Sequence, residues 1–368
     1  MLRQFSITRQ KTSRAAGKLK SALFASAFII GGAGASNAAD YTMAIAHILP
    51  EAMSNEVQVS LVHFKSLVES ATEGGIEVQI FGAMQLGSEV ETGKQAQDGA
   101  LLQSTVISSG AMSSFYPKYQ AITAPFLFPS YRVAHAFLDG AWFADFMSDS
   151  AEESGLRYLG TFDDGGGFVA FTNNKRLIKT ADDIKGLKIR VEENPAHVTV
   201  MKALGASATP LPWGEVVTAL ATGLADGQFN APGVSENFKL WEVNDYTTLS
   251  GHIYNTQTWV VSEKWFQSLP EDYQAIVIHA AQEAIGIGHG IASLAAIAGW
   301  QTSCKEFKEC YVLPTSERQA MADIARPAWR EWITTDFGLD GQIIDDMLAE
   351  VTKIGADIDA EDMRRYGR

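Results

Sequence analysis

The chain has 368 residues, of which 46% are hydrophobic, and a formal net charge of −14 at pH 7. Because one hydrophobic core stops growing well below this length, two domains are expected. The acidic charge argues against binding to nucleic acid or to an anionic membrane surface.

The first segment has the pattern of an export signal. Residues 1–20 carry six basic residues and no acidic one, and residues 23–35 form an apolar run without charge. Small residues follow at 36–38, where a signal peptidase cleaves, so we expect residues 1–39 to be a signal peptide and the mature protein to be periplasmic. The alternative is a membrane anchor, but the run is shorter than the about 20 residues that a spanning helix needs.

Short strands and helices alternate through the middle of the chain. Alternating apolar residues indicate strands, and apolar residues on one helical face indicate helices. Gly223 is expected to end a helix, as a C-terminal glycine often does. Repeated units of this kind predict an α/β fold. Strands are expected at 41–47, 76–81, 101–108, 156–162, 186–191 and 224–229, and helices at 55–70, 131–147, 196–204 and 213–222.

The C-terminal third is mostly helical, with helices expected at 271–307, 316–337 and 341–355. Residues 276–300 are apolar enough to raise the question of a membrane span. Because Gln282, Glu283 and His289 interrupt that stretch, we predict a buried helix instead.

The only two cysteines are Cys304 and Cys310. In an oxidising compartment they are candidates for a disulfide that closes a small loop. The alternative is two free thiols on one helix, where a spacing of six residues would keep them apart. Without a nearby histidine or third cysteine, metal binding is not expected.

No motif for catalysis is present. The sequence contains no nucleophile elbow, P-loop or zinc-protease helix, so no catalytic residue, cofactor or metal is predicted. Residues 163–167 read Asp-Asp-Gly-Gly-Gly, which indicates a crossover or hinge loop, with a phosphate-binding loop as the alternative. The acidic pairs at 182–183 and 192–193 are interpreted as solvated faces.

Two residues at predicted strand ends are candidates for ligand binding. Arg190 lies near the carboxyl end of a strand, where α/β sheets bind ligands. Its planar guanidinium can form paired hydrogen bonds with a carboxylate. His47 ends the first strand, where it either lines a cleft or has a structural role.

The mature sequence resembles the extracytoplasmic solute receptors of tripartite ATP-independent periplasmic (TRAP) transporters. The motifs that carry this resemblance extend over nearly all of the mature chain. They are Ala46-His47-Ile48-Leu49-Pro50, Gln85-Leu86-Gly87, Pro125-Phe126-Leu127-Phe128, Thr172-Asn173-Asn174-Lys175-Arg176, Gly186-Leu187-Lys188-Ile189-Arg190-Val191, Leu204-Gly205-Ala206, Trp213-Gly214-Glu215-Val216, Asp226-Gly227-Gln228-Phe229-Asn230 and Leu269-Pro270-Glu271.

The resemblance implies a two-lobed periplasmic binding protein of the Venus-flytrap type, with α/β lobes around a cleft and a long helix that spans both. Lobe I is expected to comprise 40–166 and 256–295, and lobe II to comprise 167–255 and 296–325. Residues 326–368 are expected to form C-terminal helices that pack on the lobes.

The resemblance also implies a binding site and a partner. Arg190 would pair with a ligand carboxylate, Asn230 would assist it, Trp213 would cover the ligand, and Tyr254 would add a wall. The expected function is to deliver a small organic acid to integral-membrane TRAP permease subunits. The oligomeric state is left open, with a monomer favoured.

Two departures from the family pattern bear on the ligand. Many relatives have an arginine after Gly-Phe, where this chain has Val169, and Phe229 replaces the commoner glutamate between Gln228 and Asn230. A second anionic group on the ligand therefore loses a partner. We expect a small monocarboxylate rather than a doubly charged acid or a bulky sugar acid.

The signal-peptide interpretation gives a direct prediction. Protein isolated from the periplasm should begin at Ala39 or Asp40 and stay in solution without detergent, because the apolar run at 23–35 is removed. N-terminal sequencing of the periplasmic fraction measures this. Recovery of residues 23–35 in a membrane fraction would contradict it.

Overall fold

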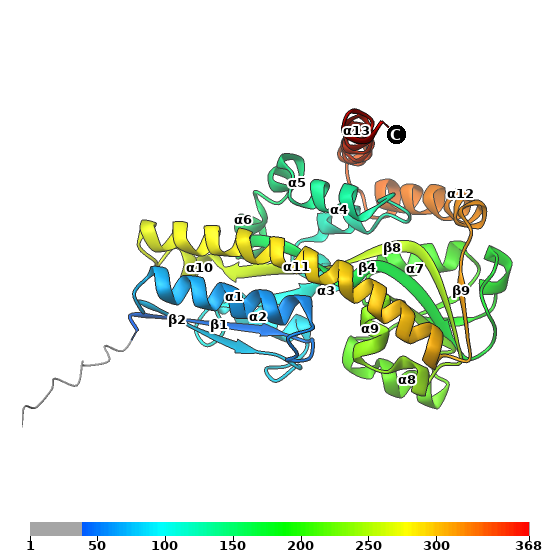
Figure 1. Ribbon diagram of the computed structural model, residues 1–368, viewed down its shortest axis with the longest axis horizontal. Helices are drawn as coiled ribbons and strands as arrows, with labels where there is room; N and C mark the ends of the chain where they lie inside the picture. Colours follow the sequence, from blue (N-terminus) through cyan, green and yellow to red (C-terminus); the bar gives the residue numbers. More distant parts are fainter. Residues whose placement is uncertain (1–38, 368) are drawn as a thin grey trace, which may run out of the picture. The chain divides into compact units, whose positions relative to one another are not determined.

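The computed structural model describes residues 39–367, which form a mixed α/β structure (Figure 1). Nearly all of the predicted signal peptide, residues 1–38, lies outside the described residues. The described strands form one nine-stranded sheet in the order β2-β1-β3-β8-β4-β7-β5-β6, and β9 pairs with β8 beside this path.

The elements follow one another with short connections. The strands are β1 Tyr41–His47, β2 Ile76–Phe81, β3 Ser104–Ser108, β4 Leu156–Asn173, β5 Lys188–Val191, β6 Ser207–Pro210, β7 Gly227–Asn230, β8 Tyr246–Ser262 and β9 Glu309–Val312. The α-helices are α1 Glu56–Ala71, α2 Glu89–Asp98, α3 Ser109–Phe115, α4 Tyr131–Leu138, α5 Ala141–Phe146, α6 Ser150–Ser154, α7 Pro195–Ala203, α8 Val216–Thr222, α9 Pro232–Asn237, α10 Glu263–Phe266, α11 Glu271–Glu306, α12 Thr315–Glu331 and α13 Gly341–Tyr366. Single turns are η1 Pro117–Thr123, η2 Ala181–Ile184, η3 Trp213–Glu215, η4 Leu240–Glu242 and the π-helical η5 Trp332–Asp336.

Two long antiparallel strands, β4 and β8, hold the sheet together. Their register runs from Leu156 opposite Ser262 to Asn173 opposite Tyr246. β3 pairs with one end of β8, whereas β9 pairs with the other end and β7 pairs with the far end of β4. Each half of the sheet is therefore bonded to the same two strands.

A glycine triplet interrupts this pairing in the middle of β4. The register shifts between Asp163 and Phe168, and Gly165, Gly166 and Gly167 all have positive φ (59°, 103° and 73°), which favours glycine over residues with a side chain. The segment predicted to be a loop is thus a bulged strand, and the loop interpretation was wrong.

The long helix α11 lies across β4 and packs on both α1 and α9 (Figure 1). Glycine allows the close approach at each end of this contact. A Cβ on Gly160 of β4 would lie 2.6 Å from Ile285 Cγ1, and one on Gly299 of α11 would lie 2.6 Å from the Gly233 nitrogen of α9. The helix therefore runs almost directly against the backbone beneath it.

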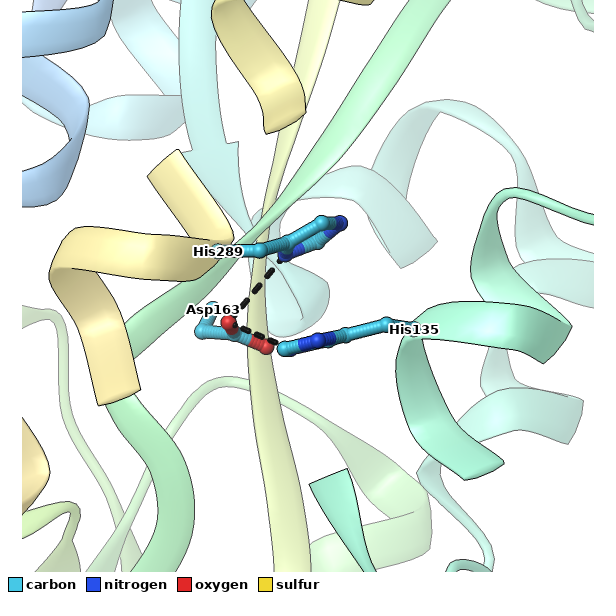
Figure 2. A group of neighbouring side chains, drawn as sticks. All are labelled: His135, Asp163 and His289. Carbon is cyan, nitrogen blue, oxygen red and sulfur yellow. Dashed lines mark hydrogen bonds and ion pairs between the residues drawn. The ribbon is translucent and has the colours of Figure 1, made fainter. Parts of the chain in front are cut away.

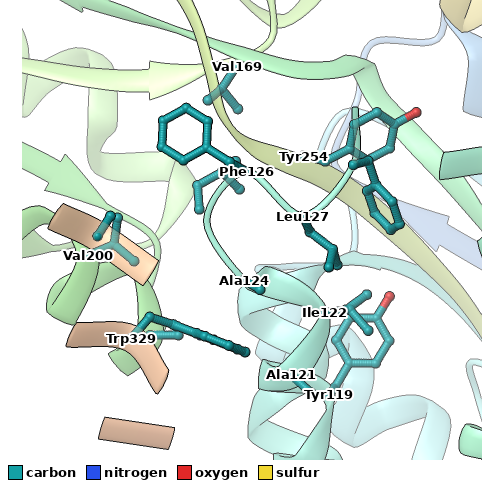
Figure 3. Packing of buried hydrophobic residues seen from close by; sticks show 14 of the residues in the cluster. Tyr119, Ala121, Ile122, Ala124, Phe126, Leu127, Val169, Val200, Tyr254 and Trp329 are labelled. Carbon is teal, nitrogen blue, oxygen red and sulfur yellow. The ribbon is translucent and has the colours of Figure 1, made fainter. Parts of the chain in front are cut away.

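The buried apolar residues fall into two main clusters. One, which includes Phe64 and Trp259 in edge-to-face contact at 4.7 Å, fills the space between α1, α11 and the β1–β3 part of the sheet. The other gathers Phe126, Tyr254 and Trp329 with many smaller side chains (Figure 3). The Pro-Phe-Leu-Phe motif thus belongs to the second cluster, where it contributes to the core.

Most predicted elements are confirmed in type, and their ends differ. The predicted helix at 131–147 was wrong as one element: it breaks at Asp139, the C-cap of α4, and at Gly140, the extended N-cap of α5. The strand predicted at 156–162 continues to Asn173. Gly223 ends α8 with φ of 73°, as predicted.

The apolar stretch at 276–300 lies inside α11, and 11 residues of that helix are buried. Among the helices of residues 39–367, none combines the length and apolar character that crossing a bilayer requires. The stretch is helical, as predicted, but only one face of it is buried, since Ile278, Leu294 and Ile297 are exposed.

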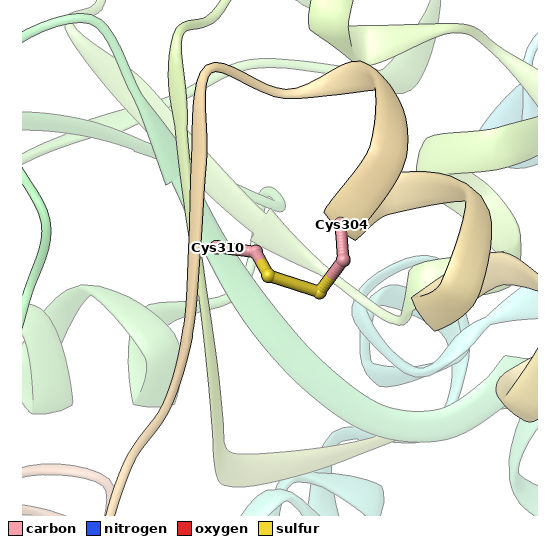
Figure 4. The surroundings of a disulfide bond; sticks show 2 residues. All are labelled: Cys304 and Cys310. Carbon is pink, nitrogen blue, oxygen red and sulfur yellow. A yellow bond between two sulfur atoms is a disulfide. The ribbon is translucent and has the colours of Figure 1, made fainter.

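A disulfide joins the end of α11 to β9 (Figure 4). Cys304 and Cys310 have Cα atoms 5.1 Å apart. The helix ends at Glu306, so the second cysteine lies on a strand and not on the helix face that two free thiols would have required. The bridge fastens α11 to the strand that pairs with β8.

Replacing both Cys304 and Cys310 with serine should lower the free energy of unfolding by about 2 kcal/mol, the chain-entropy value for so short a loop. Urea unfolding followed by circular dichroism measures the change. A thiol reductant should destabilise the unmodified protein similarly and leave the double variant unaffected. Equal stability of both proteins without reductant would contradict the prediction.

Candidate functional site

Two small adjoining cavities lie at the carboxyl ends of β1, β3, β5 and β7, where α/β sheets bind ligands. Their volumes are about 40 and 20 Å³. A larger hollow of about 840 Å³ against α7 and α12 contains none of Arg190, Trp213 and Asn230. We call the two cavities together the Arg190 pocket; both are lined by Ile48, Glu89, Ser108, Arg190, Glu192 and Trp213.

Arg190 is the central cation of this pocket. It lies on β5 and is only 3% exposed. Its Nε and Nη2 atoms donate to the Leu211 carbonyl oxygen at 2.9 and 2.6 Å, and its guanidinium lies 5.7 Å from the Trp213 ring centre. Nη1 makes no hydrogen bond to a described residue, so it can donate to a ligand.

Asn230 and Trp213 join Arg190 at the pocket, as predicted from the sequence. Asn230 ends β7, where its Nδ2 donates to Gln228 Oε1 at 2.6 Å and its Oδ1 accepts from Asn255 at 3.1 Å. This chain of amides fixes its orientation. Trp213 is half-buried and packs edge-on against Phe238 at 4.8 Å. The three residues converge from β5, β7 and η3.

Two glutamates that were not predicted as site residues also line the pocket. Glu89, the first residue of α2, accepts hydrogen bonds from the Ser108 backbone nitrogen at 2.6 Å and from its hydroxyl at 3.0 Å. Glu192 was interpreted as a solvated residue, and that was wrong: it is 9% exposed and accepts from the Gly110 nitrogen at 3.0 Å. Its position two residues after Arg190 could have indicated that it lies on the same side of the strand as Arg190.

Burial raises the pKa of each of these carboxyls. For Glu89, burial and the negative charge of Glu192 raise the pKa to about 7. For Glu192, burial raises the pKa, and the charge of Arg190 opposes that rise. The pocket therefore holds carboxyls that bind a proton more readily than surface carboxyls do.

Asp164 is the third buried carboxyl, and it lies on β4 between the two halves of the sheet. It is 5% exposed, and its Oδ1 has no hydrogen-bond partner among the described residues. Burial, with the charges of Glu56, Glu192 and Glu89, raises its pKa well above the ordinary value. The sequence had marked this residue only as part of a glycine-rich segment.

Tyr254 and His47 do not line the Arg190 pocket. The Tyr254 hydroxyl donates to Asp163, and its ring packs on Phe168 in the core. His47 is buried, with Nε2 2.8 Å from Gln58 Oε1. Both side chains lie in the interior, outside the lining of this pocket.

A separate polar group joins α4, β4 and α11 (Figure 2). Asp163 Oδ2 lies 2.8 Å from His135 Nε2 and 3.2 Å from His289 Nδ1, and the two imidazole rings stack at 3.8 Å. His289 also pairs with Asp139 at 3.2 Å. Asp163 precedes the glycine triplet, so the group fixes three elements beside the register shift.

The charges in this group stabilise one another. Burial alone would raise the pKa of Asp163, but hydrogen bonds and charge from His135 and His289 lower it to about 2. Burial alone would lower the pKa of His289, but Asp139 and Asp163 raise it to about 9. The three ligand-type atoms lie within 4.8 Å of one another, and His and Asp are donors for zinc. A metal would have to displace the protons that now join them.

Comparison with known proteins identifies the family. The family model for bacterial extracellular solute-binding proteins of family 7 (DctP) matches residues 45–335. The chain belongs to this family. Its members are the solute receptors of TRAP transporters, so the chain is a TRAP-type receptor, as the resemblance implied.

Individual relatives agree with this assignment. A solute-binding protein of Verminephrobacter eiseniae is 34% identical over 68% of this chain and 72% of its own length. The ectoine/5-hydroxyectoine-binding periplasmic protein of Ruegeria pomeroyi is 33% identical over 64% of this chain and 68% of its own length. A sugar acid binding protein of Advenella mimigardefordensis, solved with galactonate, has a TM-score of 0.79 and 26% identity over 85% of this chain and 98% of that chain.

These matches confirm the predicted fold class, because the solved relatives are two-lobed α/β periplasmic binding proteins. The family consists of receptors that bind solutes rather than of enzymes.

The His135–Asp163–His289 group predicts a pH-dependent stability. A raised folded-state pKa of His289 stabilises the fold fully below the unfolded value of 6.5, and this contribution is lost as pH rises through about 9. The lowered pKa of Asp163 contributes above 3.8 and is lost as pH falls through about 2. His289→Gln should cost about 2 kcal/mol near pH 6 and nearly nothing above pH 9.

Thermal and urea unfolding of both proteins across this range measure the difference. His279→Gln is the matched control, because His279 is exposed on the same helix; it should leave stability unchanged at every pH. A destabilisation by His289→Gln that is constant with pH would contradict the electrostatic account.

Proposed function

We propose that the receptor binds a small organic acid with one carboxylate in the Arg190 pocket and delivers it to the membrane subunits of a TRAP transporter. The observation that carries the proposal is Arg190 itself, a buried guanidinium with a free donor edge at the sheet's ligand-binding end. A buried cation of this kind requires a charge-assisted partner, and a carboxylate suits its planar geometry.

The neighbours of Arg190 support a carboxylate ligand. Asn230 can orient one ligand oxygen with its amide, and Trp213 can cover the apolar part of the ligand. The two relatives described above bind ectoines and a sugar acid respectively, each of which carries a single carboxylate. The small volume of the pocket favours a compact acid over a bulky one.

We propose that the lobes are 40–166 with 256–295 and 167–255 with 296–325, and that residues 326–368 pack on them. The shared strands β4 and β8 support this division, since each crosses from one group of strands to the other. Residues from both groups line the pocket, so a ligand that contacts both favours the closed arrangement.

The export of the receptor belongs to the same proposal. A cleaved segment at 1–39 would release the protein into the periplasm, where permease subunits receive the ligand. A TRAP receptor has these membrane subunits as its partners, and a monomer is sufficient for the delivery.

Arg190→Ala should weaken binding of the cognate acid by about 2 to 5 kcal/mol, roughly 30-fold to several thousand-fold in Kd. Arg190→Lys keeps the charge but loses the planar fork, so its loss should be smaller. Asn230→Ala should cost about 1 to 3 kcal/mol, because a carboxylate oxygen loses a donor. Calorimetric titration with galactonate, ectoine and 5-hydroxyectoine measures each Kd.

The control is Arg132→Ala, which removes an exposed arginine paired with Asp362 on the surface and should not change Kd. Thermal unfolding of each variant separates lost binding from lost structure. If Arg190→Ala stayed folded and bound the acid as tightly as the unmodified receptor, the proposed site would be wrong.

A further inference from the structure

The Arg190 pocket holds more acidic groups than a simple carboxylate ligand can use. Arg190 is the one cationic side chain among its described lining residues, which also include Glu89, Asp164 and Glu192. Asp164 and Glu192 are buried, Glu89 is half-buried, and a fourth acidic residue of the lining, Glu193, is exposed. A ligand that carried only a negative charge would add to the excess of acidic over basic groups in the pocket.

Among the carboxyls that line the pocket, one buried oxygen has no hydrogen-bond donor from the described residues. Glu89 is satisfied by Ser108, and Glu192 accepts from the Gly110 nitrogen. Asp164 Oδ1 is buried at the pocket and accepts no hydrogen bond from a described residue. A buried acceptor of this kind is costly unless a donor meets it. The missing donor is therefore expected on the ligand.

The surroundings of Asp164 define what kind of donor fits. Four charged groups from three elements act on it: Glu56 on α1, Glu89 on α2, and Arg190 and Glu192 on and directly after β5. Three of these four are acidic. Such a setting favours a cation, since nearby opposite charge stabilises an ionised carboxylate and like charge does the reverse.

We propose that the ligand is a zwitterion, with a carboxylate that pairs with Arg190 and an ammonium or amidinium group that donates to Asp164 between Glu89 and Glu192. This rests on the proposed function, in which the Arg190 pocket is the ligand site, and it specifies the class of acid. The ligand remains a monocarboxylate and adds no net charge to the pocket.

A hydroxylated acid is the competing class, because its hydroxyl groups can also donate to Asp164. Zwitterions and hydroxylated anions differ in the sign of the proton exchange that accompanies binding. A cation beside Glu89 and Asp164 lowers the pKa of these carboxyls, so the receptor releases protons when it binds the ligand. An anion with neutral hydroxyl groups raises the pKa of the same carboxyls, so the receptor takes up protons. The sign of proton exchange therefore identifies the class.

The experiment is calorimetric titration of the unmodified receptor near pH 7 in two buffers of different ionisation enthalpy. Ectoine and 5-hydroxyectoine are the zwitterionic probes, and galactonate is the hydroxylated anionic probe. Valine beside 2-hydroxyisovalerate and 4-aminobutyrate beside 4-hydroxybutyrate give pairs that differ only in the amine. At least one zwitterion should bind at least tenfold more tightly than any anionic probe, and with proton release.

A second arm uses Asp164→Asn and Glu89→Gln, which remove the acceptor charge and keep the side-chain shape. Each should weaken binding of the preferred zwitterion at least tenfold and should not weaken binding of the anionic probes. Asp182→Asn is the matched control, because it removes one acidic charge from an exposed site on η2; it should change neither. Thermal unfolding checks that the variants fold.

Tighter binding of an anionic probe, with proton uptake, would overturn the inference and leave the proposed function intact. Binding that is unaffected by Arg190→Ala would instead place the ligand elsewhere and overturn both. If no probe of either class bound the folded receptor, the proposed small-acid function would fail and the inference would fail with it.

Discussion

The antiparallel pairing of β4 with β8 is the constraint on which the rest of the receptor depends. These strands pair with β3 at one end and with β7 and β9 at the other, so the two halves of the described sheet are joined through them. Backbone hydrogen bonds in a ladder are lost together when a strand moves away. The ladder is irregular at three places, and the longest irregularity, between Asp163 and Phe168, spans the glycine triplet.

The same interruption places polar groups at the junction. Asp163 turns toward His135 and His289 in the interior, and its neighbour Asp164 reaches the Arg190 pocket. Adjacent residues on a strand point to opposite faces, so one dipeptide serves a stabilising ion-pair group and the ligand site. Ionisable side chains are rarely buried in protein interiors, and exceptions to this rule are expected at functional sites.

Much of the fold could be predicted because periodicity and glycine signals are local. β1, β2 and α11 were found almost to the residue, as was the stop at Gly223. The length of β4 could not be, since it depends on pairing with a distant strand. The break at Gly140 was missed although a glycine is a local signal for a helix end.

The candidate site divides in the same way. Arg190, Asn230 and Trp213 could be placed through motif spacing, and the pocket brings them together. Glu89, Asp164 and Glu192 could not, because an acidic residue on a surface and one in a pocket look the same in a sequence. Tyr254 shows the converse: it lies on the expected strand, but its side chain faces the core.

The close seating of α11 on β4 has a mechanical consequence. At Gly166 an added Cβ would lie 2.9 Å from the Ala296 Cα atom, and at Gly299 it would lie 2.6 Å from the Pro232 carbonyl carbon. Because no side chain separates the two backbones at these glycines, the helix cannot approach the strand further. The disulfide fixes the C-terminal end of the helix to β9. The helix therefore resists displacement toward the sheet, and the disulfide restricts movement of its C-terminal end relative to β9.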